Sequence, residues 1–153
     1  MGRKPKPKLT PEQQERAEKI ALVAKYQMAV IYGNIYKSIK EQIDKGVHQV
    51  EVDTEKATEN EKEDIYYTLI WGHTRAGSEA GLLDKEKPIE RDDCDFTTYN
   101  LTEDLTSTDK RYLSQLLEQE LYDVKWLKAQ IDEKISQEEF AEYSEHAVKL
   151  RWS

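Results

Sequence analysis

The chain has 153 residues, the size of one domain, and its formal net charge is -8 at pH 7. Hydrophobic residues make up 37% of it and charged residues 35%, and no apolar run approaches the ~18 residues that a membrane-spanning helix needs. The single cysteine, Cys94, excludes an internal disulfide framework, and the N-terminus lacks the apolar segment of a signal peptide. This composition predicts a cytoplasmic, mainly helical protein with a thin, elongated body.

The first eight residues carry a charge opposite to that of the rest of the chain. Their four cations are Arg3, Lys4, Lys6 and Lys8. The other residues hold 19 basic and 31 acidic side chains, a net charge of -12. The prolines in this stretch disfavour helix, and its charges repel one another. We therefore expect residues 1–9 to form a disordered basic arm and residues 10–153 to form a single helical domain.

The first helix is predicted to begin at a capping box. Thr10 supplies the N-cap, a proline follows at the first helical position, and Gln13 completes the box. Seven apolar residues then recur three and four apart: Ile20, Ala24, Met28, Ile31, Ile35, Ile39 and Ile43. Gly46 comes next, as a C-cap should. The pair Gly33-Asn34 leaves open whether this is one kinked helix or two.

The middle of the chain predicts less regular structure. Residues 47–53 alternate apolar and polar side chains and indicate a short strand. FTTYN at 96–100 is a weaker strand candidate, and if it is a strand, VEV in this segment is its one plausible partner. Asn60 is expected to cap a helix that begins at Glu61. The glycines at 72, 77 and 81 weaken this helix, so we expect it to fray or turn before Leu82. The rest of 84–100 is expected to be irregular.

The longest predicted helix begins near Asp109, capped by Thr108 or Ser107. Its stripe comprises Leu113, Leu117, Leu121, Val124, Leu127, Ile131 and Ile135. That stripe extends about 40 Å and packs either on the first helical region or on a second copy, so a homodimer is left open. Ser136 and Glu139 form a capping box for a shorter last helix. The fold class is therefore mainly α, an elongated bundle of about four to five helices with at most a small two-stranded β element.

No motif in the sequence predicts catalysis or metal binding. The stretch GHTRAG (72–77) has the glycine spacing of a P-loop, but Ser78-Glu79 follows where the loop needs Lys and then Ser or Thr. Cys94 lies among acidic residues, which disfavour a reactive thiolate. The three histidines, His48, His73 and His146, are spread along the chain. We therefore expect that the protein is not an enzyme and that it has no cofactor and no metal site.

Aromatic residues give the candidate protein-binding positions. The chain has nine tyrosines against two phenylalanines, and tyrosine favours half-buried positions and interfaces. Tyr32 and Tyr36 lie one turn apart beside the isoleucine stripe, and Trp71, His73 and Arg75 form a second local cluster. Each group has two interpretations: packing at the edge of the core, or a contact surface for a partner or a second copy.

The basic arm gives the candidate nucleic-acid contact, since a flexible cationic tail binds phosphate by releasing counterions. The arm has three alternative roles: it is a solubilising tail, it is a nuclear import signal, or it binds an acidic protein partner. The opening GRKPKPK is similar to the starts of many phage small terminase subunits and phage DNA-binding regulators, over the first eight residues. We therefore expect a non-enzymatic accessory protein of a nucleic-acid machine (packaging, replication, transcription or defence), encoded on a phage or another mobile element.

The acidic body supports an alternative function from another class. Residues 51–64 and 90–95 are dense in carboxylates. A surface of this kind can mimic nucleic acid and occupy the basic cleft of a target enzyme. An inhibitor of that type would not need the arm.

Overall fold

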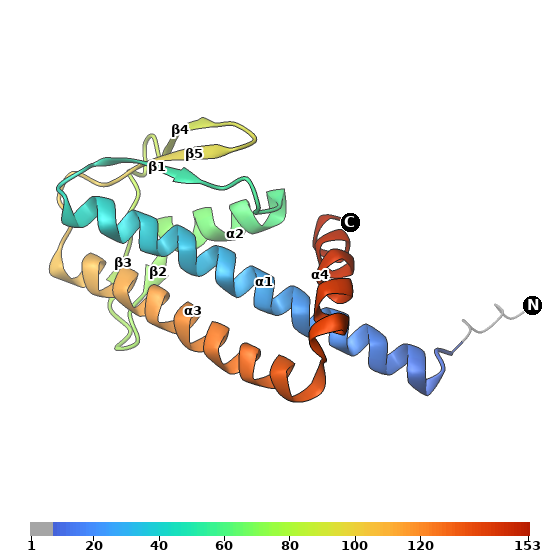
Figure 1. Ribbon diagram of the computed structural model, residues 1–153. Helices are drawn as coiled ribbons and strands as arrows, with labels where there is room; N and C mark the ends of the chain where they lie inside the picture. Colours follow the sequence, from blue (N-terminus) through green and yellow to red (C-terminus); the bar gives the residue numbers. More distant parts are fainter. Residues whose placement is uncertain (1–7) are drawn as a thin grey trace, which may run out of the picture. The chain divides into compact units, whose positions relative to one another are not determined.

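The computed structural model describes residues 8–153, and about 62% of these are helical (Figure 1). The helices are α1 (Pro11–Asp44), α2 (Glu59–Ile70), α3 (Ser107–Lys134) and α4 (Gln137–Trp152). The strands are β1 (Gln49–Asp53), β2 (Gly72–His73), β3 (Glu79–Ala80), β4 (Ile89–Asp92) and β5 (Phe96–Asn100). The prediction of a mainly α protein with a small β element is confirmed. None of the helices in this part of the chain has both the length and the apolar character needed to cross a membrane.

The chain divides into two compact units. The central unit is Met28–Lys125, and the terminal unit combines Met1–Gln27 with Trp126–Ser153. Each has its own cluster of buried hydrophobic side chains. The single domain expected over residues 10–153 stays a prediction, and the two units are described separately below.

Helix α1 is continuous from its predicted start to its predicted end. The Gln13 N–H donates to Thr10 Oγ1 at 3.1 Å and the Thr10 N–H to Gln13 Oε1 at 3.0 Å, which is the expected capping box. Gly46, with φ of +81°, follows the helix, in the left-handed conformation that glycine adopts at little cost. Gly33 does not break the helix. It faces α3 closely, since a Cβ at this position would lie 3.6 Å from Glu120 Cβ.

The central unit packs its helices and strands around one core. Its fully buried side chains include Ile35 and Ile39 of α1, Ile65 and Leu69 of α2, Val50 and Val52 of β1, Tyr99 of β5 and Leu113 of α3. Burying a side chain of this size contributes roughly 1.5–3 kcal/mol. The predicted α1 stripe therefore does face the core in this unit.

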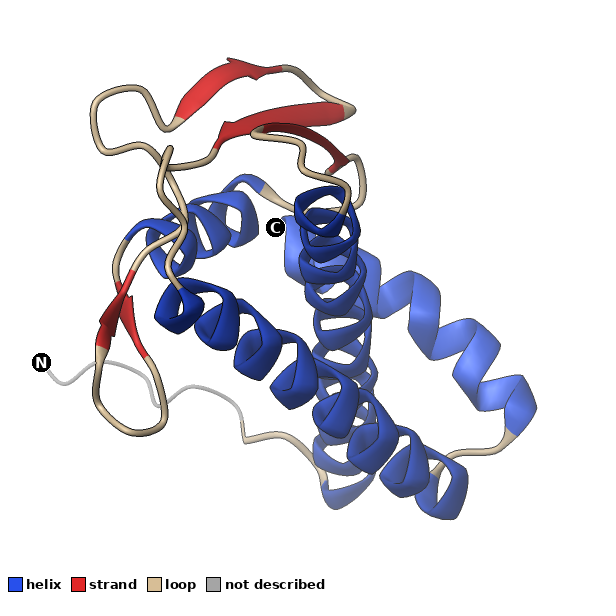
Figure 2. Ribbon diagram, turned by 90° about the vertical axis from the view of Figure 1, so that its left-hand side faces the viewer, coloured by secondary structure: helices blue, strands red, loops and turns tan. Residues whose placement is uncertain are grey.

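Two antiparallel sheets belong to the central unit, and Figure 2 shows their strands in red. The three-stranded sheet has the order β1-β5-β4, and β2 pairs with β3 separately. The pairing of β1 with β5 confirms the expected strand partners. The limit of one two-stranded element was wrong, because β4 pairs along the other edge of β5. The segment IERD is short and has one apolar residue, so it gave no period-two signal.

The caps of α2 and α3 lie one or two residues before the expected positions. Thr58 and Glu61 form a reciprocal capping box that begins α2, with both N–H···O distances at 3.1 Å, where Asn60 was expected. Thr106 and Asp109 exchange the same pair of bonds at the start of α3, at 3.0 and 3.1 Å. Each threonine has an acidic residue three positions later, and the carboxylate of that residue accepts the N–H of the threonine.

The α3 stripe is interrupted in the middle. Leu113, Leu127, Ile131 and Ile135 are buried, but Leu121 is 54% exposed. At this turn the half-buried side chain is Glu120, which lies against Gly33. Because neighbouring residues on a helix differ by about 100°, Leu121 points away from that contact. The stripe is therefore not buried along its whole length within one chain, and the alternative that it pairs with a second copy stays a prediction.

The terminal unit has a smaller core of its own. It contains Val23 and Ala24 of α1, Ile131 and Ile135 of α3, and Tyr143 and Ala147 of α4. The predicted Ser136–Glu139 capping box is present at the start of α4. Arg16 Nη2 lies 3.4 Å from Glu142 Oε1 and 3.1 Å from His146 Nε2, so the acid–histidine pair on α4 is contacted by an arginine.

Candidate functional site

A β-hairpin follows α2 in the central unit. Strands β2 and β3 pair antiparallel, and the turn between them is closed by the Thr74 N–H donating to the Ser78 carbonyl oxygen at 2.8 Å. Gly77 takes the positive φ, +84°, that this turn requires. The glycine spacing of residues 72–77 therefore belongs to a hairpin that comes after a helix. The interpretation that it is not a P-loop is confirmed.

Contacts with α3 fix the tip of the hairpin. The Arg75 N–H donates to Gln115 Oε1 at 2.9 Å, and Arg75 Nη1 lies 3.4 Å from Glu118 Oε2. Arg75, one of the candidate partner-binding residues, thus has partners within its own unit. Its backbone bond and its ion pair hold the hairpin against the first half of α3.

Two glycines let the hairpin approach its neighbours closely. A side chain at Gly72 would overlap the Tyr112 ring, whose hydroxyl donates to the Thr68 carbonyl oxygen at 2.6 Å. A Cβ at Gly81 would lie 2.6 Å from the Ile70 carbonyl oxygen, which is too close for any side chain. Neither position can carry a side chain unless the backbone or Tyr112 moves.

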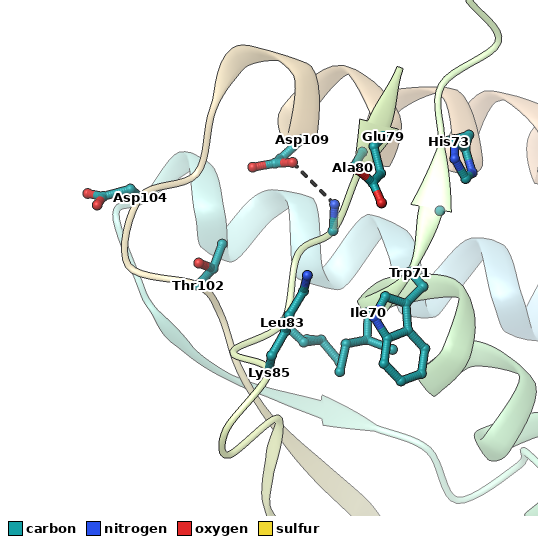
Figure 3. Close-up of a pocket in the computed structure, with 12 residues that line it drawn as sticks. Ile70, Trp71, His73, Glu79, Ala80, Leu83, Lys85, Thr102, Asp104 and Asp109 are labelled. Carbon is teal, nitrogen blue, oxygen red and sulfur yellow. Dashed lines mark hydrogen bonds between the residues drawn. The ribbon is translucent and has the colours of Figure 1, made fainter. Parts of the chain in front are cut away.

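Asp109 joins the hairpin to the start of α3. One carboxylate oxygen accepts the Thr106 N–H of the capping box at 3.0 Å, and the other accepts the Gly81 N–H at 3.2 Å (Figure 3). A carboxylate near a helix N-terminus also interacts favourably with the helix dipole. Asp109 is therefore a positioning residue for the cavity that lies beside it.

A cavity of about 450 Å³ lies between this hairpin, the end of α2 and the start of α3. Its ionisable lining residues are Glu79, Asp104, Asp109, Lys85 and His73 (Figure 3). Trp71 supplies an aromatic wall, and Ile70, Gly72, Ala80, Gly81, Leu83 and Thr102 complete the lining. Three carboxylates face one ammonium group, so the lining has a net charge of -2 when the histidine is neutral.

An aromatic surface adjoins this cavity, made of Tyr66, Tyr67 and Trp71. Tyr67 and Trp71 are stacked with ring centroids 6.0 Å apart and an interplanar angle of 18°. Tyr66 meets Tyr67 edge to face at 5.1 Å. Tyr67 is 48% exposed and Trp71 58%, although each is a large aromatic side chain. Trp71 belongs to both features, since it also lines the cavity.

The structure brings some of the candidate partner-binding residues together and separates others. Trp71 and His73 line the cavity, and Arg75, in the turn between β2 and β3, lies outside it and contacts α3. Tyr32 and Tyr36 are buried in the core of the central unit, at 8% and 2% exposure. This burial favours the packing interpretation for these two tyrosines, because neither ring has a surface free for a partner.

The candidate nucleic-acid contacts lie at the N-terminal end of the chain. Arg3, Lys4 and Lys6 fall outside the residues that the structure describes. Lys8 is described and exposed. The phosphate-binding role of these four cations stays a prediction.

A half-buried polar cluster forms where α1, α2 and α3 meet within the central unit. The Tyr32 hydroxyl donates to Asp64 Oδ2 at 3.0 Å. Burial, and then the negative charges of Asp123 and Asp64, raise the pKa of Glu120 to about 7. Burial and the nearby Asp64 likewise raise the pKa of Tyr32 well above its usual value, so the phenol stays protonated as the donor.

Sequence reasoning missed most of the cavity lining. Asp104 and Lys85 had no motif around them, and Glu79 was noted only as a departure from the P-loop pattern. A charged residue in so acidic a chain carries little information by itself. Asp109 had a usable signal, since it stands three residues after Thr106 in a capping-box spacing. Among residues 8–153, no three His, Cys, Asp or Glu side chains come together as possible metal ligands.

Comparison with protein-family models, with curated proteins and with solved structures finds no match to this chain. The aromatic surface and the adjoining acidic cavity are therefore the features from which a function is inferred.

Proposed function

We propose that the protein is a non-enzymatic binding protein of a nucleic-acid machine. Its central unit binds a partner protein through Tyr67 and Trp71, and its basic N-terminal arm contacts phosphate. The observation that carries this proposal is the stacked, half-exposed Tyr67–Trp71 pair.

Stacked aromatic rings at a surface suit protein binding for two physical reasons. Each ring offers a large apolar area with little conformational freedom to lose, and tyrosine and tryptophan are enriched among the residues that dominate interface energies. The contact between the rings also fixes their orientation before a partner arrives, which lowers the entropy cost of binding. Neither ring is needed to fill the core, because both remain about half exposed.

The net charge of the body indicates which part of the chain binds phosphate and which part binds protein. Aromatic rings can also stack on nucleic-acid bases. Here, however, the pair lies beside a cavity of net negative charge, on a body whose net charge is -12 outside the first eight residues. A polyanion would be repelled from this surface. Phosphate binding is therefore assigned to the arm, and protein binding to the aromatic surface.

Capture of a partner from a cognate host lysate tests the protein-binding part. The full chain is compared with the variants Tyr67→Ala and Trp71→Ala. Tyr122→Ala is the matched control, because Tyr122 is 64% exposed in the same unit but lies away from the cavity. A band that both aromatic variants lose and the control keeps supports the proposal. Bands that all three variants retain equally would contradict it.

One observation favours the nucleic-acid-mimicking inhibitor as a second candidate. The two acid-rich segments, 51–64 and 90–95, are brought together by the three-stranded sheet. The Thr54 N–H donates to the Asp95 carbonyl oxygen at 2.8 Å, so the end of β1 adjoins the β4–β5 turn. At this turn the Asp93 carboxylate accepts the N–H groups of Asp95 and Phe96, which lowers its pKa and keeps it ionised.

A displacement experiment distinguishes the two candidates. The inhibitor is expected to displace duplex DNA from a basic partner, with or without residues 1–8. The accessory protein is expected to bind duplex itself and to lose that binding when residues 1–8 are deleted. Displacement that is unaffected by the deletion would favour the inhibitor, and duplex binding that disappears with the arm would favour the accessory protein.

A further inference from the structure

We infer that the cavity beside Trp71 receives a positively charged side chain, an arginine or lysine, from the partner protein. This inference rests on the proposed function, since it places a specific group of the partner next to the aromatic surface. It commits the partner to a basic segment and predicts how each charge in the cavity alters binding.

The carboxylates of the cavity are unequally engaged. Asp109 uses both oxygens to accept backbone N–H groups, from Thr106 and Gly81. Glu79 and Asp104 are exposed, and within residues 8–153 neither has a hydrogen-bond or ion-pair partner at its carboxylate. Two free carboxylates at the edge of a concave site attract a cation and can accept its N–H donors. The charge of the cavity is therefore complementary to a basic side chain.

The aromatic wall suits the same kind of group. A cation over the face of a tryptophan is attracted by the ring, which is the strongest of the aromatic acceptors. Trp71 lines the cavity, and its stacking on Tyr67 holds the indole in place. Arginine has the further advantage that its planar guanidinium can stack on the indole while it donates to carboxylates. An anionic or purely apolar group would leave the two carboxylates without a partner.

Lys85 also lines the cavity, and Figure 3 shows its side chain entering from the side opposite Asp109. Its ammonium group already offsets part of the negative charge and competes with an incoming cation. Removing it should therefore strengthen binding, while removing Glu79 or Asp104 should weaken it. Because a charge removed anywhere on the body alters the binding of a polycation in the same direction, an effect larger than that of a matched substitution outside the cavity is what assigns the cation to the cavity.

The probe for the experiment is an acetylated, fluorescein-labelled hexa-arginine amide, titrated against the full-length protein by fluorescence anisotropy. We expect Glu79→Gln and Asp104→Asn each to weaken binding about 2- to 5-fold, and Lys85→Gln to strengthen it by a similar factor. Glu103→Gln is the matched control, because Glu103 is exposed beside Asp104 but does not line the cavity. It reports the effect of one lost negative charge anywhere on this acidic body.

The chain also offers a positional readout. It has three tryptophans, and the other two, Trp126 and Trp152, are exposed at 53% and 50%. In the Trp126→Phe/Trp152→Phe background the emission comes from Trp71 alone. Unlabelled hexa-arginine should change this emission with the same dissociation constant that anisotropy gives, and hexaglutamate should not change it.

Failure of the inference can be told apart from failure of the proposed function. If Glu79→Gln and Asp104→Asn weaken binding no more than Glu103→Gln does, the cavity does not bind the cation and the inference is overturned. Lysate capture that still depends on Tyr67 and Trp71 would then leave the proposed function standing. The substituted residues are exposed, so each variant should retain its circular dichroism spectrum and its unfolding midpoint.

Discussion

The Tyr32 hydroxyl donates a 3.0 Å hydrogen bond to the Asp64 carboxylate and so links α1 to α2 inside the central unit. We expect Tyr32→Phe to lower the free energy of unfolding by about 1 to 2 kcal/mol, because a hydrogen bond to a charged acceptor is lost while the ring stays in place. Urea denaturation measures the change. Tyr122→Phe is the control, since that hydroxyl belongs to a 64% exposed side chain. An equal, near-zero effect in both variants would show that the bond contributes nothing.

Stability should depend on pH through Glu120, whose pKa is raised to about 7. The folded state then binds more protons than the unfolded state between the ordinary glutamate pKa, near 4.5, and pH 7. The free energy of unfolding should therefore fall as pH rises through this window, and the loss should be complete above about pH 8. Chemical denaturation at a series of pH values measures it.

The variant Glu120→Gln should remove this pH dependence. One pKa unit corresponds to about 1.4 kcal/mol, and solvent screens a side chain that is only half buried, so we expect it to be about 1 to 2 kcal/mol more stable than the natural protein at pH 8. The two proteins should converge near pH 4. Glu133→Gln, an exposed position on the same helix, should leave the pH profile unchanged. A Glu120→Gln profile parallel to that of the natural protein would argue against this role.

Gly72→Ala should destabilise the central unit, because the added methyl group would overlap the Tyr112 ring. Overpacking of this kind costs about 1–3 kcal/mol. In a Tyr112→Ala background the same change should cost less, since the obstructing ring is gone. A double-mutant cycle by urea denaturation measures the coupling, and additive effects would mean that the two residues do not clash.

The start and the middle of the α3 stripe should respond differently to substitution. Leu121→Glu should change the free energy of unfolding by less than about 0.5 kcal/mol, because the side chain is 54% exposed. Leu113→Ala should cost about 2–5 kcal/mol, because Leu113 is buried. If the protein is a homodimer through this face, light scattering should show that Leu121→Glu lowers the molar mass without unfolding. An unchanged mass at high concentration would exclude that dimer.

The arm gives a quantitative prediction for nucleic-acid binding. Four cations displace about four counterions, so the log of the affinity for duplex DNA should fall with the log of the salt concentration at a slope of roughly -3.6. Affinity should be weak and little dependent on sequence, because phosphate contacts carry no base information. Deletion of residues 1–8 should abolish binding without changing the circular dichroism spectrum. Binding that survives this deletion with the same slope would assign phosphate contact elsewhere.

The sequence predicted the fold well where a physical signal was local and periodic. The capping boxes at Thr10 and Ser136 and the apolar stripe of α1 are in the structure as expected. The strand pair β1–β5 was also found, because one alternating segment had one plausible partner. Strand β4 was missed because main-chain pairing along β5, rather than its own side chains, defines it.

The site was harder to predict because it is assembled from distant segments. Trp71 and His73 were selected as a local cluster, but the cavity also needs Asp104 and Asp109, which lie more than thirty residues later in the chain. What brings them together is the close approach at Gly72 and Gly81. In a sequence, a glycine can indicate either a flexible segment or a close contact with a neighbouring element. The structure was therefore needed to show that Gly72 and Gly81 serve close packing.

The turn between β4 and β5 carries the exposed thiol of Cys94, and no other cysteine occurs in the chain. A maleimide reagent can therefore modify one known position without any engineered substitution. A photo-crosslinker attached there would capture molecules that reach the acidic end of the three-stranded sheet. A fluorophore at the same atom would report their arrival in real time, so the natural protein already carries its own attachment point for single-molecule and crosslinking studies.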